Sequence, residues 1–115
     1  PRSDLIRAED APTINLSGEG AREQLLTPRD ESHLQLIRST MPPGSHGGEG
    51  LYTLNAEVEV LHVLEGTVEI QFTNRVERLE AGDTITFSGR EPHTWRNREE
   101  TTAHVLWIIA PAAWH

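Results

Sequence analysis

Glu57-Val58-Glu59-Val60-Leu61-His62-Val63-Leu64-Glu65-Gly66 is the stretch that decides the fold of this 115-residue chain. Successive side chains of an extended strand point to opposite faces, so Glu59, Leu61 and Val63 share one face. Gly66 supplies the backbone freedom that a turn needs. The stretch therefore predicts a strand over residues 57–64 that carries a glutamate on an otherwise apolar face.

The same period-two pattern recurs downstream in short runs that turn residues separate. The strands expected there are residues 68–72, 76–79, 84–87, 93–97 and 104–110. His93, Trp95 and Asn97 share a face of the fourth of these strands. The last strand is almost wholly apolar, which indicates that both of its faces are covered, and Pro111 ends it. This part of the chain is therefore expected to be all β.

The N-terminal third has a weaker pattern. Strands are expected around residues 5–7, 23–26 and 34–41, between Gly, Pro and Asp signals. A flexible loop, residues 42–50, follows and contains His46; we expect it to form the mouth of a pocket. The prediction is one domain over residues 1–115, with N-terminal strands in 1–41 and a core in 42–111.

Composition excludes several classes of function. The net charge of −8 disfavours binding to the phosphates of nucleic acid, so any DNA contact must come from another part of the protein. The absence of cysteine excludes disulfides, thiolate metal sites and a cysteine nucleophile. No apolar run approaches the roughly 18 residues of a membrane span, so no membrane partner and a cytoplasmic location are expected.

Two segments resemble the two motifs of the cupin superfamily. Glu59 and Gly66 keep the spacing at the end of the first motif, within its Val-Leu-Glu-Gly ending. The second motif opens with Gly82-Asp83, continues to Pro92-His93 and closes with Asn97. The resemblance implies a double-stranded β-helix, or jelly-roll barrel, with a small-molecule or metal pocket in its lumen.

The layout also resembles the C-terminal sensor domains of helix-turn-helix regulators of the XRE type. These have a Pro-Gly-Ser-like loop before the glutamate strand and a final strand like residues 106–111. The resemblance implies that a DNA-binding domain lies upstream of Pro1, which would then be a fragment boundary. The cupin resemblance implies a homodimer under every interpretation, because cupins of this size often pair through sheet edges, and the apolar final strand offers surface to bury.

In metal-binding cupins, two histidines, a glutamate and a later histidine hold iron, manganese, nickel or zinc. The resemblance maps the glutamate onto Glu59 and the later histidine onto His93. The other two positions are Thr53 and Asn55, which are poor ligands for such a metal. His46, in the loop, is a candidate replacement, whereas His62 is disfavoured because it lies three residues from Glu59 on the opposite face.

Three interpretations of Glu59 and His93 remain open. They orient an organic effector in a pocket lined by Trp95, Asn55, Leu61, Val63 and His46. Alternatively, they hold a divalent metal with His46 or His62, in a small dioxygenase, isomerase or epoxidase. In the third interpretation they satisfy each other inside a filled barrel. The leading hypothesis is a metabolite-sensing domain of a transcriptional regulator without a cofactor; a binding or storage cupin is a further alternative.

Overall fold

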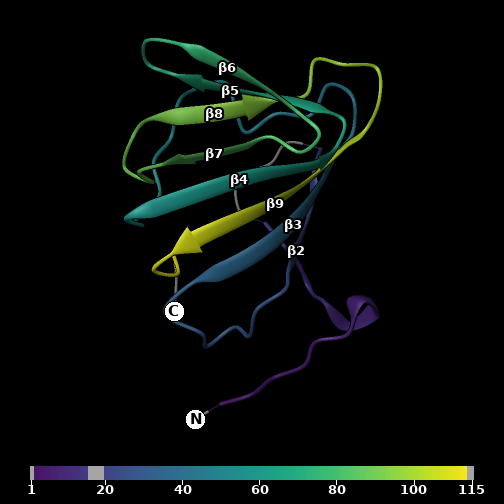
Figure 1. The fold of residues 1–115 in the computed structure, drawn as a ribbon, viewed down its shortest axis with the longest axis vertical. Helices are drawn as coiled ribbons and strands as arrows, with labels where there is room; N and C mark the ends of the chain where they lie inside the picture. The colour runs from purple at the N-terminus through teal and green to yellow at the C-terminus, as the bar shows by residue number, and fades with distance from the viewer. Residues whose placement is uncertain (1, 16–19, 114–115) are drawn as a thin grey trace.

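The computed structural model describes residues 2–15 and 20–113, which fold into two antiparallel sheets packed face to face (Figure 1). The six-stranded sheet has the order β1-β2-β3-β9-β4-β7, and the three-stranded sheet has the order β6-β5-β8. The elements are η1 (Ala8–Asp10), β1 (Thr13–Ile14), β2 (Arg22–Leu25), β3 (Gln35–Met41), β4 (Val58–Glu65), β5 (Thr67–Phe72), β6 (Val76–Glu80), β7 (Thr84–Phe87), β8 (His93–Arg96) and β9 (Ala103–Ala110). The expected all-β jelly roll is confirmed.

The strand predictions from residue 23 onward agree with the structure to within one residue at each end. The expected strand at residues 5–7 is wrong. That segment pairs with no neighbouring strand, and Leu5 is largely exposed. Three residues of alternation are too short to specify a strand, and the first strand is instead β1, which pairs with β2.

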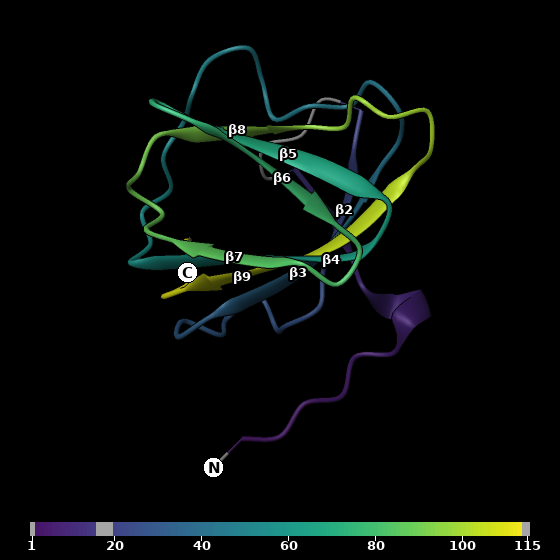
Figure 2. The same ribbon diagram turned by 45° about the horizontal axis from the view of Figure 1, so that its top comes forward.

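The core lies between the two sheets, which Figure 2 shows facing each other. Alternate residues of β3, β4, β5 and β9 are buried, in the period-two pattern that a sheet with one core-facing side requires. Strand β9 lies between β3 and β4 and carries Val105, Trp107 and Ile109 inward. No helix in the described ranges 2–15 and 20–113 is long and apolar enough to cross a membrane.

The loop over residues 42–56 closes one side of the barrel by running along β8. His46 forms a bridge with Arg96, and Tyr52 forms one with His93. The backbone N–H of Gly47 donates to the carbonyl of Trp95 at 2.9 Å. A Cβ atom on Gly47 would lie 2.8 Å from the Trp95 indole, so only glycine allows the loop this close.

The turn between β4 and β5 depends on Gly66, whose φ is +83°. A Cβ atom there would lie 2.8 Å from the Cα of Ala103 and 2.9 Å from the carbonyl oxygen of Thr102. Both are backbone atoms of the chain entering β9, so neither moves easily. The turn that ends the motif stretch is therefore fixed by sterics as well as by backbone conformation.

Gly66→Ala is expected to destabilise the fold more than Gly82→Ala does. Both substitutions place an alanine at positive φ, which costs about 1–2 kcal/mol. Only Gly66→Ala adds a backbone clash, worth about 1–3 kcal/mol more, because Gly82 has nothing within 4 Å of its Cβ position. Urea denaturation of the two variants measures the difference; equal losses of stability would contradict the packing argument.

Candidate functional site

The structure brings Glu59 and His93 together across the lumen. Glu59 comes from β4 of the six-stranded sheet and His93 from β8 of the three-stranded sheet. Their side chains are 1% and 0% exposed, and Glu59 Oε1 lies 3.3 Å from His93 Nε2. This ion pair therefore joins the two sheets inside the barrel.

The hydrogen bond on the far side of the His93 ring fixes where its protons must be. His93 Nδ1 lies 2.7 Å from the carbonyl oxygen of Glu91, which can only accept, so Nδ1 carries a hydrogen. Nε2 faces Glu59 Oε1, which also accepts when it is ionised. Two bare acceptors 3.3 Å apart would repel, so one of the two facing atoms, Glu59 Oε1 or His93 Nε2, must carry a proton.

Electrostatics favour a charged His93. Burial is the largest single effect and lowers the pKa of His93. The hydrogen-bonding and charge interactions with Glu59, together with the Glu91 carbonyl, outweigh it, so the pKa of His93 lies above its ordinary value of 6.5. The site accordingly favours an imidazolium facing Glu59, although Nε2 and Oε1 do not reach hydrogen-bond geometry.

Aromatic rings surround the imidazole of His93. The ring centroids of Tyr52 and Phe87 each lie 4.6 Å from the imidazole centroid, and that of Phe72 lies 6.4 Å away. Strand alternation predicts inward positions for Phe72 and Phe87, but Tyr52 is in a loop and gives no periodic signal. These rings keep water from the ion pair and leave it in a medium of low dielectric.

The rest of the lumen is filled by side chains. Leu61, Val63 and Trp95 have no exposed surface, which leaves no space for water against them. The indole N–H groups of Trp95 and Trp107 are buried, and no group in the described part of the chain accepts a hydrogen bond from them. The sequence indicated Trp107 only as a packing residue, because a polar atom without a partner leaves no mark on a hydrophobic pattern.

Two other candidate residues, Asn55 and His62, do not join the pair. Asn55 is exposed, and its Oδ1 lies 3.5 Å from Arg90 Nη2, so the expectation that it lines the lumen is wrong. The reason is that β4 begins only at Val58, which leaves positions 53 and 55 in the loop. His62 points outward and places Nδ1 2.7 Å from Thr84 Oγ1.

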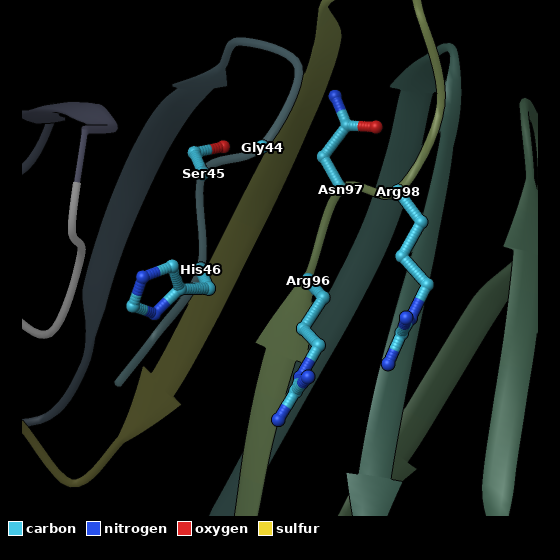
Figure 3. A pocket seen from close by; sticks show the side chains of 6 residues that line it. All are labelled: Gly44, Ser45, His46, Arg96, Asn97 and Arg98. Carbon is cyan, nitrogen blue, oxygen red and sulfur yellow. The ribbon is translucent and has the colours of Figure 1, made fainter. Parts of the chain in front are cut away.

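His46 lies in a surface hollow of about 350 Å³, together with Gly44, Ser45, Arg96, Asn97 and Arg98. Figure 3 shows its ring turned away from Arg96, whose side chain runs beside that of Arg98. Gly48 N–H donates to His46 Nδ1 at 3.0 Å, so a neutral His46 carries its hydrogen on Nε2. The loop thus lines a surface hollow that is separate from the Glu59–His93 pair, and His46 does not join that pair.

The donor set at the pair is too small for a metal centre. A catalytic zinc site uses three protein ligands and a structural site uses four. Within the described residues, no group of three or more His, Cys, Asp or Glu side chains is placed to hold a metal ion. Glu59 and His93 alone do not fit the iron, manganese, nickel or zinc site that the motif positions would otherwise form.

Two antiparallel sheets closed around a buried Glu–His pair define the chain as a small jelly-roll barrel protein. The sequence matches the cupin domain family (Cupin_2) over residues 37–109, well over half of its length. The chain belongs to this family. No curated protein sequence matches it significantly.

Several solved structures share the fold. A predicted oxalate decarboxylase from Thermotoga maritima is 22% identical, with 94% of this chain and 99% of that one covered and a TM-score of 0.77. The cupin domain of an XRE family transcriptional regulator from Enterobacter cloacae is 20% identical, with coverage of 80% and 97% and a TM-score of 0.69. An HTH_3 family transcriptional regulator from Vibrio cholerae is 22% identical, with coverage of 78% and 50% and a TM-score of 0.65.

Removing one member of the ion pair is expected to be worse than removing both. Glu59→Leu or His93→Leu leaves a buried group without its partner and should lower the free energy of unfolding by about 3–5 kcal/mol. The double variant should recover at least about 2 kcal/mol of that loss, because no uncompensated charge remains. Urea denaturation gives the three values.

Glu69→Leu is the matched control, since its partner Arg98 is 58% exposed and the loss should be at most about 1 kcal/mol. Additive effects of Glu59→Leu and His93→Leu would contradict the coupling.

Between about pH 5 and pH 9, the ion pair should stabilise the protein most at the acidic end. Because the pKa of His93 is raised in the folded state, its contribution is fully present below the unfolded value of about 6.5 and is lost as pH rises through the folded value. The stability difference between wild type and the double variant should therefore fall above about pH 6.5. Urea titrations between about pH 5 and pH 9 test this; a difference that grows with pH would contradict the sign.

Proposed function

We propose that the chain is a small-molecule-sensing cupin domain of a transcriptional regulator that binds a metabolite in the barrel lumen. One observation supports the proposal: among the described residues, four buried polar atoms of lumen side chains make no hydrogen bond, and two of these are the facing atoms of the Glu59–His93 ion pair. They are Glu59 Oε1, His93 Nε2, Trp95 Nε1 and Trp107 Nε1. Buried polar groups are normally satisfied, so such a set is suited to a polar ligand that brings the missing donors and acceptors.

The unpartnered atoms define the chemistry of the proposed ligand. Glu59 accepts hydrogen bonds, whereas the two indoles and a charged His93 donate them. A ligand that inserts between Glu59 and His93 must therefore supply both a donor and an acceptor. A small polar metabolite with hydroxyl, or amino and carboxyl, groups meets this requirement.

Ligand entry requires movement, because the lumen residues of this structure are closed to water. Tyr52 is the ring beside His93 that comes from a loop rather than from a strand. Backbone hydrogen bonds of 2.8 and 3.0 Å between Tyr52 and His93 hold it in place. A ligand that binds an open arrangement of the 42–56 loop more tightly shifts the protein toward that arrangement. This change in the loop is the signal that a sensor transmits.

The regulatory context is supported by the fold likeness to the XRE and HTH_3 regulators. The net charge of −8 is unsuited to DNA, so the proposal assigns DNA binding to an upstream domain of a cytoplasmic protein. We also propose a homodimer. Strand β9 is central in its sheet, so pairing would use the outward side chains Leu106 and Ile108 rather than an edge.

A metal-dependent dioxygenase, isomerase or epoxidase is less well supported than a sensor. The Thermotoga maritima structure with an enzyme name shares the fold at 22% identity, which carries no residue roles. The proposed sensor needs only the polar side chains of Glu59 and His93, and no cofactor.

Metabolite-induced stabilisation should depend on Glu59. In a thermal-shift screen of amino acids, polyamines, sugars and small carboxylic acids, at least one compound should raise the melting temperature of wild type. The rise should disappear in Glu59→Gln and persist in Arg78→Gln, whose exposed side chain pairs with Glu99.

Elemental mass spectrometry of the untagged protein, purified without added metal, provides the second measurement. We expect far less than one transition metal per chain. One metal per chain, lost in both Glu59→Ala and His93→Ala, would overturn the proposal in favour of the enzyme. Shifts that Glu59→Gln leaves unchanged would contradict binding in the lumen.

A further inference from the structure

A hollow of about 490 Å³ lies outside the barrel, between the N-terminal segment and the outer face of β2 and β3. Figure 2 shows the segment with η1 leaving the six-stranded sheet near β2. The hollow is lined by Ile6, Ala8, Ala11, Arg22, Gln24, Leu26, Arg38 and Thr40. Its volume is within the range of roughly 300–1,000 Å³ that small-molecule sites occupy.

Two arginines stand on the strand side of this hollow. Arg22 pairs in register with Thr40, and Gln24 pairs with Arg38, so the two arginines are diagonal neighbours on adjacent strands. Such neighbours have Cα atoms about 7–8 Å apart, within reach of one small anion for side chains this long. Within residues 2–15 and 20–113, neither arginine forms an ion pair with a carboxylate.

The opposite side of the hollow is mainly apolar. Ile6, Ala8 and Ala11 come from the N-terminal segment, and Leu26 follows β2. Gln24 Nε2 lies 3.4 Å from the carbonyl oxygen of Ala11, a contact that ties this segment to the strand. The hollow is therefore lined by two arginines on its strand side and by apolar side chains on the opposite side.

We propose that this hollow is a second ligand site, for a small organic acid with a short hydrocarbon chain. The guanidinium groups of Arg22 and Arg38 bind the carboxylate through paired N–H donors, and the apolar wall covers the chain. The rest of the protein is strongly acidic and repels anions, so binding relies on these two side chains. The site is independent of the proposed lumen site, because its lining shares no residue with it.

Titrations monitored by amide chemical shifts in NMR test the proposal, with hexanoate, acetate and inorganic phosphate as probes. Hexanoate should saturate and shift amides of β2, β3 and the 6–11 segment. Acetate should bind roughly tenfold more weakly, because it lacks the chain that the apolar wall would cover. Phosphate should also bind more weakly than hexanoate, since it brings charge without hydrocarbon.

Substitutions at the two arginines distinguish binding in this hollow from binding in the lumen or at other surface cations. Arg22→Gln and Arg38→Gln should each weaken hexanoate binding roughly tenfold, as expected for loss of a charge-assisted hydrogen bond. Arg38→Lys, which keeps the charge but not the fork, should give a smaller loss. Arg78→Gln, on the other sheet, and Glu59→Gln, in the lumen, should leave the affinity unchanged.

Three results would overturn the proposal. One is hexanoate binding that is absent or insensitive to Arg22→Gln and Arg38→Gln. A second is phosphate binding as tight as hexanoate binding, which indicates a bare anion site. The third is a set of shifts centred on β4 and β8 and lost in Glu59→Gln, which would assign hexanoate to the lumen.

Discussion

The buried ion pair of Glu59 and His93 is the constraint on which the interior of this barrel depends. Because His93 Nδ1 donates to the Glu91 carbonyl, the ring cannot turn its other nitrogen into a donor without becoming charged. Because Tyr52, Phe72 and Phe87 surround the ring, water cannot replace the carboxylate. The carboxylate and the imidazolium belong to different sheets. The ion pair between them therefore both joins the two sheets and sets the charge inside the lumen.

The pair also limits what the lumen does chemically. Metal-binding members of this family hold the ion with three histidines and a glutamate, and this chain keeps two of those four ligands. The positions of the missing two fall on Thr53 and Asn55, both exposed and before the start of β4. What remains among the described residues is a buried Glu–His pair in an apolar interior, with too few ligands for a metal site.

Sequence patterning predicted most of the fold, because apolar and polar residues alternate along a strand that is buried on one face only. It predicted β4 to β9 to within a residue and placed Glu59 and His93 on inward faces. It missed β1, whose two residues are too few to show a period, and it assigned a strand to residues 5–7 that has no partner. Tyr52 and the Arg22–Arg38 hollow were not predictable, since both depend on contacts between segments that local pattern does not encode.

The most direct measurement is the protonation of His93, read from the ¹⁵N shifts and one-bond couplings of its ring nitrogens near pH 7. We expect hydrogens on both Nδ1 and Nε2, with the Nε2 hydrogen retained as pH rises through the ordinary histidine value of about 6.5. Glu59→Gln should release that hydrogen at lower pH, because the partner no longer carries a charge. A neutral wild-type ring at pH 7, with a bare Nε2, would contradict the claim that the barrel is centred on an ion pair.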